Sequence, residues 1–525
     1  MDLHITAADP RQKGKVHGFR WNHPPPQSVH QSIMKDDYSW AWIEAQGLQC
    51  AEVWKACALP TLPELPRYSS WQQRSREKAY DEGLKEAGRA ARLADRTPAG
   101  RKLARERITE LFPRFATGAL GLGTDQVTLV TESFLPVSAQ LMQWTRAFDP
   151  EMSMEDTVQA ARNAWIACGM QALVGQPMKL TPSVLAYSLL YPYSDNFLDQ
   201  PEISEHEKIA FSERFRQRLR GRQLTARSRR EASVWTMVRM IEEEHPRERS
   251  PQVFQSLLAI HQAQEESLGQ LQVRPDRNGS SVPPIAQRTR NGWGTDCFLS
   301  AEQVLRISCA KGGSSVLADA CLVRPDLTPQ ESSFSFQWGV LLQLGDDLQD
   351  VAADIERGSQ TLFTLAVREG RPLDGLVRQL LHFSERVAEQ MQRLEHGSAA
   401  LKQLMRASWR LLILMAAADA QPFFTQKFLA ELEPHSGFRF GFQRKRKEKL
   451  AGRQSLYAPL FDAFQEDAPG ALSVPMALCE PWTESSQLLR AVDATAMSPA
   501  LQRGVGVTNH SFGVPEGRCS CSAPV

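Results

Sequence analysis

Neither sign of charge dominates this sequence. The 525 residues carry 61 basic and 60 acidic side chains, a formal net charge of +1, and this balance argues against a general nucleic-acid-binding protein. A run of 18 apolar residues is missing and the polar start is unlike a signal peptide, so we expect a chain that neither spans a membrane nor is exported. The nine cysteines form no CxxC pair, which predicts free thiols in a reducing cytoplasm.

The sequence also lacks the short motifs that mark several large enzyme classes. HExxH, GxSxG, the P-loop and GxGxxG are all missing, which removes the usual signatures of zinc proteases, α/β-hydrolases and nucleotide-binding folds. A strand-like alternation of apolar and polar residues is missing as well. Apolar residues instead recur at spacings of three and four, the pattern of amphipathic helices. The predicted fold class is therefore all-α.

The helical pattern divides the chain into three parts. Residues 1–110 are predicted to be an N-terminal extension, irregular at first and then a charged helical pair over 70–111. Residues 111–433 are predicted to form a helical bundle. Residues 434–525 begin with a basic segment and continue without periodicity, so we expect a disordered or loosely attached tail. Within the bundle, Thr181-Pro182 predicts a helix start and residues 271–300 are predicted to form a loop. Amphipathic helices are expected at 204–219, 231–244, 251–270, 301–323, 330–356, 373–394 and 399–418.

One segment gathers acidic residues directly behind an apolar run. In FQWGVLLQLGDDLQDVAADI (336–355) there is no basic residue, and the acids are Asp346, Asp347, Asp350 and Asp354, here called the second acidic cluster. On a helix these carboxylates are neighbours, so they repel and raise one another's pKa. Such a cluster is typical of a site for divalent cations, and a solvated acidic helix face is the alternative. The apolar stripe expected to face the core consists of Phe336, Val340, Leu344, Leu348 and Val351.

A first acidic pair lies upstream, at the end of another apolar helix. In YPYSDNFLD (191–199), Asp195 and Asp199 are four residues apart, so one helical turn can direct both carboxylates to one point. Two surface aspartates near a helix end are the ordinary alternative. Two such clusters in one helical body suit a diphosphate ester held by several Mg²⁺ ions, or by Mn²⁺ in their place. The metals make the diphosphate a leaving group, and an apolar interior shelters the allylic cation from water.

With these residues the chain resembles the class I isoprenoid synthases, the superfamily of trans-polyprenyl synthases and class I terpene synthases. FQWGVLLQLGDDLQDV is similar to the FQ…DDxxDV helix of polyprenyl synthases, and CAKGGSSVLADACLV (309–323) stands where those enzymes carry a lysine that grips the diphosphate. The resemblance covers about residues 120–430 and implies that superfamily's antiparallel helical bundle. It implies Asp195, Asp199, Asp346, Asp347 and Asp350 as catalytic metal ligands, and Lys311, Gly312 and Gly313 as diphosphate-binding residues.

The chain departs from the chain-elongating members of that superfamily. The first motif of those enzymes is DDxxDxxxxRRG. In this chain the corresponding segment is DNFLD (195–199), and the next arginines lie only at 214–220. Those enzymes also carry GGKRLRP shortly before the first motif, and nothing like it lies there in this chain. The NSE/DTE signature of terpene synthases is missing too. The resemblance then implies a one-substrate reaction, in which a prenyl diphosphate is ionised and cyclised or undergoes elimination. The alternatives are a polyprenyl diphosphate synthase that also uses isopentenyl diphosphate, a non-catalytic partner subunit of one, and a helical scaffold with fortuitous acids.

Two other segments have two interpretations each. FRFGFQRKRKEK (438–449) suits an anionic membrane surface, and peripheral membrane association would serve a lipid substrate; a solvated segment is the alternative. In HQAQEE (261–266), Gln264 or Glu265 could line the substrate cavity, but a solvent-facing helix edge is the favoured interpretation. The expected partners are thus a prenyl diphosphate and no nucleic acid, with a membrane surface and a second copy of the chain as open expectations.

Overall fold

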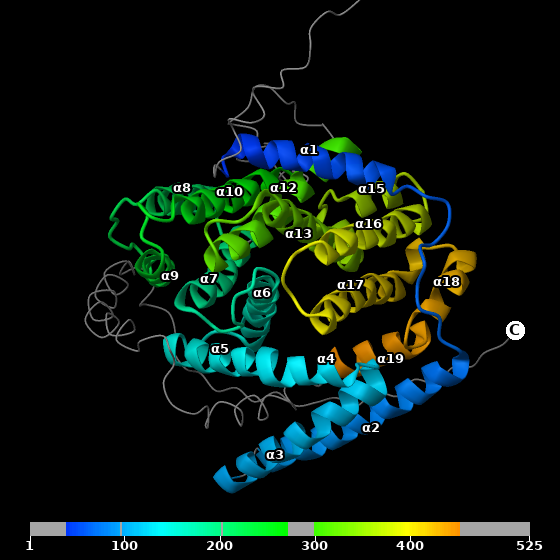
Figure 1. Cartoon of the computed structure of the whole chain (residues 1–525). Coiled ribbons are helices and arrows are strands. Elements are labelled where there is room, and N and C mark those ends of the chain that lie inside the picture. Colours follow the sequence, from blue (N-terminus) through cyan, green and yellow to red (C-terminus); the bar gives the residue numbers. More distant parts are fainter. Residues whose placement is uncertain (1–37, 95–96, 201–202, 271–298, 452–525) are drawn as a thin grey trace, which may run out of the picture.

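The computed structural model describes residues 38–94, 97–200, 203–270 and 299–451. Within these ranges the chain is helical and contains no β-strand, so the all-α prediction is confirmed (Figure 1). The predicted loop lies almost entirely outside the described residues, as does the tail beyond residue 451. The α-helices are α1 (Trp40–Ala56), α2 (Ser70–Ala94), α3 (Pro98–Phe115), α4 (Thr124–Leu129), α5 (Leu135–Phe148), α6 (Met154–Leu173), α7 (Pro182–Asp199), α8 (Glu205–Leu219), α9 (Arg229–Glu244), α10 (Pro251–Ser267), α12 (Ala301–Val323), α13 (Pro329–Gln349), α14 (Val351–Arg357), α15 (Leu362–Arg368), α16 (Asp374–Gln392), α17 (Ala399–Asp419), α18 (Gln426–Leu432) and α19 (Phe440–Ala451).

Short helical turns of other types complete the described chain. Two π-helical turns, η1 (Ala116–Leu120) and η2 (Val130–Phe134), flank α4. Three 3₁₀ turns follow α10, α17 and α18, and they are η3 (Leu268–Gln270), η4 (Gln421–Phe423) and η5 (Glu433–His435).

The helix starts follow from local capping. Thr181 Oγ1 accepts a hydrogen bond from the Val184 backbone N–H at 3.3 Å, and Pro182 takes the first helical position of α7, as predicted. Ser300 and Thr328 cap α12 and α13 in the same way, each with a reciprocal side chain three residues on. The predicted 330–356 helix is two helices, because the backbone leaves helical geometry at Asp350 (φ −94°, ψ 6°).

The N-terminal extension contains a regular helix where an irregular segment was predicted. Helix α1 packs against α12, α13 and α16, and its Ile43, Cys50 and Trp54 are buried in the main core. Its apolar residues do not fall on one stripe, since Leu48 remains 53% exposed. That mixed pattern is why the sequence carries no clear helical period here.

The charged helical pair predicted for 70–111 is present as α2 and α3. The two helices pack on each other through a small core made of Ala90, Ala91, Ala94 and Ala104, and they extend away from the bundle (Figure 1). The basic segment forms α19, which packs on α17. Part of its charge is neutralised within the protein, because Arg446 pairs with Asp81 of α2 and Lys447 lies 2.7 Å from Asp419.

Helices α12 and α13 form the centre of the core. Helix α12 packs against α13, α10, α1 and α6. The α12–α13 contact depends on glycine: a Cβ on Gly339 would lie 2.0 Å from the Gly312 carbonyl oxygen, and one on Gly313 would lie 2.4 Å from the Phe336 ring. The predicted core stripe, which runs from α13 to Val351 of α14, is buried throughout, as are the five described cysteines, all of which are free. None of the described helices combines the length and apolar character that crossing a membrane requires.

Candidate functional site

The predicted site residues lie on three helices and one break between helices. Asp195 belongs to the last turns of α7, and Lys311 lies in the middle of α12. Asp346 and Asp347 are in the last turn of α13, and Asp350 separates α13 from α14. Asp199 is the final residue of α7, and its side chain lies outside the part of the chain that the structure describes.

Lys311 and Asp195 bring α12 and α7 together. The Lys311 Nζ atom lies 3.7 Å from Asp195 Oδ1. The aspartate is only 4% exposed, so the ammonium group compensates a carboxylate that has little contact with water. The sequence predicted these two residues at one diphosphate site, and the structure places them side by side.

The charge of Lys311 also acts on Asp346. Its side chain reaches solvent, but protein surrounds the carboxyl group closely enough that loss of bulk water raises its pKa to about 6. The guanidinium of Arg162 and the ammonium of Lys311 act in the opposite direction, and the Asp350 carboxylate raises the pKa further. Lys311 therefore influences both acidic segments. Arg162, on α6, is a nearby cation that no sequence pattern indicates, because a single arginine on an amphipathic helix resembles any other.

Asp347 is held by protein donors. It accepts hydrogen bonds from Gln343 Nε2 at 2.8 Å and from Ser308 Oγ of α12 at 3.0 Å. Burial raises its pKa to about 7; the two hydrogen bonds lower the pKa, while Asp354 and Asp346 raise it. A large fraction of this carboxyl is therefore protonated near neutral pH.

The other two acids of the second cluster differ in exposure. Asp350 is exposed at the helix break. Asp354 is buried, and burial raises its pKa although Arg357 donates a hydrogen bond to it at 2.8 Å and lowers that pKa. Arg357 lies just beyond the segment that has no basic residue, so a cation does compensate the end of this cluster.

The carboxylates at this site are hard oxygen ligands of the kind that Mg²⁺ prefers. Among the described side chains, no three His, Cys, Asp or Glu residues converge as a ready metal site. Asn196, in the first motif, turns away and donates to Asp156 Oδ1 of α6 at 2.8 Å. Asp195, Asp346 and Asp350 therefore remain separate candidate ligands, which the described side chains do not bring together at one point, and Asp347 is bound to its own donors.

Gly312 and Gly313 are buried in the α12–α13 contact. Their position next to Lys311 follows from helix packing, since a side chain at either one would collide with α13. Their predicted contact with a diphosphate remains a prediction.

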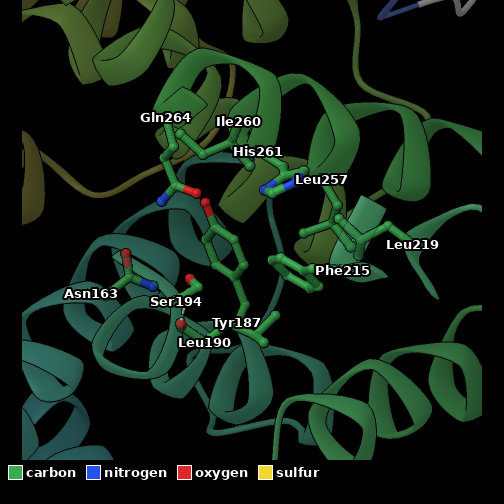
Figure 2. Close-up of a pocket in the computed structure, with 10 residues that line it drawn as sticks. All are labelled: Asn163, Tyr187, Leu190, Ser194, Phe215, Leu219, Leu257, Ile260, His261 and Gln264. Atoms are coloured by element: carbon green, nitrogen blue, oxygen red, sulfur yellow. Dashed lines mark hydrogen bonds between the residues drawn. The ribbon is translucent and has the colours of Figure 1, made fainter. Parts of the chain in front are cut away.

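A small cavity lies between α6, α7, α8 and α10 (Figure 2). The space open to the centre of a water molecule is about 30 Å³, which is enough for a water but not for an isoprenoid chain. Ser194, one of its lining residues, is the neighbour of Asp195 in the chain. The wall consists of Asn163, Tyr187, Leu190, Ser194, Phe215, Leu219, Leu257, Ile260, His261 and Gln264.

His261 and Gln264 line this cavity and are 2% and 6% exposed. The favoured sequence interpretation, a solvent-facing helix edge, is therefore wrong for both residues. The polar string HQAQEE looks like a surface segment, and the packing of α12 and α8 on α10 explains why part of it is buried.

No protein-family model, curated protein or solved structure matches this chain. The all-helical architecture stands on the structure alone. Membership of the class I isoprenoid synthases rests on the order and chemistry of the motifs and stays a prediction.

The geometry nonetheless has a definite chemical character. Carboxylates from α7 and α13 lie near a shared lysine of α12, and a second cation from α6 is close by. An anion that brings its own divalent cations would find both positive donors and metal ligands here, next to a largely apolar cavity wall.

Proposed function

We propose that this protein ionises an allylic prenyl diphosphate in the presence of Mg²⁺ and converts the cation to a terpene by cyclisation or elimination. One observation carries the proposal: Lys311 lies between the two acidic segments, 3.7 Å from Asp195 and close enough to Asp346 to lower its pKa. A lysine shared by two acidic segments is suited to an anion that arrives with metal ions, because both kinds of partner are then compensated.

The residues have separate roles in this proposal. Lys311 would exchange its contact with Asp195 for the diphosphate oxygens, and Arg162 would add positive charge from α6. Asp195, Asp346 and Asp350 would hold the metal, joined by Asp199 and Asp347 as the resemblance implies. When bound, Mg²⁺ supplies the charge neutralisation that makes diphosphate a leaving group.

The carbon–oxygen bond then breaks and its electron pair leaves with the diphosphate. The apolar part of the cavity wall, which includes Leu190, Phe215 and Leu257, would face the remaining hydrocarbon and keep water from its cation. Because about 30 Å³ is too little for that chain, substrate binding would have to widen this cavity.

The test is incubation with prenyl diphosphates from C10 to C35 and Mg²⁺, with and without isopentenyl diphosphate. We expect diphosphate release and a terpene product without the second substrate. Chain elongation only when both substrates are present would replace this proposal with a polyprenyl diphosphate synthase. Lack of turnover under every condition would favour a partner subunit or a scaffold.

A double variant tests the assignment of the metal ligands. Asp346→Ala combined with Asp350→Ala should reduce diphosphate release by about 100-fold or more, since it removes two of the ligands. Asp326→Ala is the matched control, because its side chain is 86% exposed between α12 and α13. Full activity of the double variant would disprove the metal assignment.

A further inference from the structure

Positive charge is concentrated on one part of this molecule. Helices α2, α3 and α19 together contain 16 basic and 7 acidic residues, a surplus of nine positive charges. Since the whole chain has a formal net charge of +1, its other residues carry a surplus of eight negative charges. The balanced total therefore includes a strongly basic region, which lies where the α2–α3 pair extends away from the bundle (Figure 1).

The exposed cations of α2 follow a single face of the helix. They recur at intervals of three, four and seven residues, which places them within an arc of about 60° around the helix axis. The first and the last are 18 positions apart, so this face is about 27 Å long. It is here called the basic ridge, and it consists of Arg74, Lys78, Lys85, Arg89 and Arg92, all of which are exposed.

The acidic residues of α2 leave the basic ridge largely uncompensated. Three of the four pair with arginines outside α2: Glu77 with Arg439, Asp81 with Arg446 of α19, and Glu86 with Arg114 of α3. The fourth, Glu82, lies 3.8 Å from Lys78, and both side chains are more than half exposed, so this pair contributes little. The other four cations of the ridge have no ion-pair partner among the described residues.

The shape of the ridge suits a flat anionic surface. A line of cations along one helix can lie against a plane over its whole length, and each cation then contributes to the attraction. Trp71 lies on the same face, three residues before Arg74, and is 76% exposed. Tryptophan is enriched at the headgroup level of membranes, where its ring is partly in apolar and partly in polar surroundings. Both features favour a lipid surface.

A nucleic acid fits this region less well. The groove between α2 and α19 has a volume of about 410 Å³, but Glu77, Asp81 and Glu82 line it together with the cations. These carboxylates would repel a phosphate backbone that followed the groove. The major groove of a duplex admits one helix, whereas α2 is packed along α3 and joined to α19 by an ion pair.

We propose that the basic ridge docks this protein onto a membrane that contains anionic phospholipids. The contact is peripheral and mainly electrostatic, with Trp71 at the headgroup level at one end of the ridge. Helix α19 adds exposed cations to the same region, namely Arg444, Lys445 and Lys449. The inference goes beyond the proposed function and does not depend on it, because the ridge lies outside the bundle that carries the candidate site.

The test is cosedimentation of the full-length protein with two kinds of vesicle, one of phosphatidylcholine alone and one of phosphatidylcholine mixed equally with phosphatidylserine. We expect binding to the anionic vesicles only, and weaker binding as salt is added, because ions screen exposed charges. Equal binding to both kinds of vesicle, or to neither, would overturn the inference. Tighter binding to short RNA or duplex DNA in the same buffer would also overturn it, in favour of a nucleic-acid surface.

A triple variant tests the ridge itself. Arg74→Gln, Lys85→Gln and Arg89→Gln together remove three cations that have no ion-pair partner among the described residues, and glutamine keeps the helix propensity of α2. Because each basic residue near an anionic membrane changes the affinity about fivefold, the triple variant should bind the anionic vesicles about 100-fold more weakly. Unchanged binding would contradict the proposal.

The matched control removes the same charge from other exposed positions. Arg222→Gln, Arg249→Gln and Arg393→Gln change residues near the ends of α8, α9 and α16. This variant should bind the anionic vesicles as the wild type does. An equal loss of binding in the two triple variants would show that total charge, and not the basic ridge, determines the attraction, and would likewise overturn the proposal.

Discussion

Asp319 is a carboxyl group that lies entirely inside the protein. It is 0% exposed, and its Oδ1 accepts a hydrogen bond from Asn163 Nδ2 at 3.2 Å. Its Oδ2 has no hydrogen-bond partner among the described residues. Burial raises the pKa of this group well above its ordinary value, and the Asn163 hydrogen bond offsets only part of that effect. The folded protein therefore favours the protonated form of Asp319 more strongly than the unfolded chain does.

That protonation makes stability depend on pH. Because the folded-state pKa of Asp319 is raised, the folded protein binds a proton that the unfolded chain releases above about pH 4, so stability falls as pH rises towards the folded pKa. The slope from one such group is at most about 1.4 kcal/mol per pH unit. Asp319→Asn should remove this contribution and keep the bond from Asn163. Urea unfolding at pH 5 and pH 8 should show a smaller loss of stability for the variant than for the wild type.

The control for this measurement is an exposed carboxyl. Asp326→Asn changes a side chain that is 86% exposed and should leave the difference between pH 5 and pH 8 as it is in the wild type. Equal pH dependence of the wild type and Asp319→Asn would contradict a protonated Asp319.

At the scale of the elements, the α12–α13 contact determines where the candidate site lies. Gly312, Gly313 and Gly339 allow two helix backbones to approach closely, and Lys311 and Asp346 are carried on those two helices. A change in this contact would displace the lysine relative to the second acidic cluster. The glycines thus act on the site through packing, whatever contact they have with a ligand.

Gly339→Ala tests that contact. The new Cβ would lie 2.0 Å from the Gly312 carbonyl oxygen, which is a backbone atom that cannot rotate away. We expect a loss of about 3 kcal/mol or more in the free energy of unfolding, at the upper end of overpacking costs, measured by urea denaturation. Diphosphate release should fall with it.

Gly375→Ala on α16 is the matched glycine control. Its Cβ would meet nothing within 4 Å, so alanine's better helix propensity should leave stability unchanged or raise it by up to about 1 kcal/mol. Wild-type stability in Gly339→Ala would show that α12 and α13 do not need the close approach.

Local signals explain which elements the sequence could predict. Thr181-Pro182 predicted the start of α7, and α12 has the predicted bounds, because capping and periodicity depend on nearby residues only. The buried state of His261 and the Ser308–Asp347 hydrogen bond depend on which helix covers which. These contacts are between residues that are far apart in the chain, and a single sequence contains no local signal for them.

At the scale of the whole molecule, the N-terminal segment belongs to the same body as the candidate site. The Tyr38 and Ser332 hydroxyls share a hydrogen bond of 2.7 Å, and Gln379 Nε2 donates to the Trp54 carbonyl at 2.7 Å. These two bonds tie the N-terminal segment to α13 and α16, and helix α1 packs on α12 as well. The sequence predicted an irregular extension here, and no local pattern in it shows that α1 packs against the helix that carries Lys311.

Trp54→Ala tests whether α1 is an integral part of this body. Trp54 is 5% exposed, and its ring lies 5.9 Å from that of Phe383 in an edge-to-face arrangement. Removing a buried indole of this kind should lower the free energy of unfolding by about 3–5 kcal/mol. Trp71→Ala is the control, because Trp71 is 76% exposed on α2 and its loss should change stability by about 0.5 kcal/mol at most. If α1 is integral, amide hydrogens of α12 should also exchange faster in Trp54→Ala, since the destabilisation then reaches the whole core. A loss of protection confined to α1 would mean that the helix opens independently of the bundle and does not support the site.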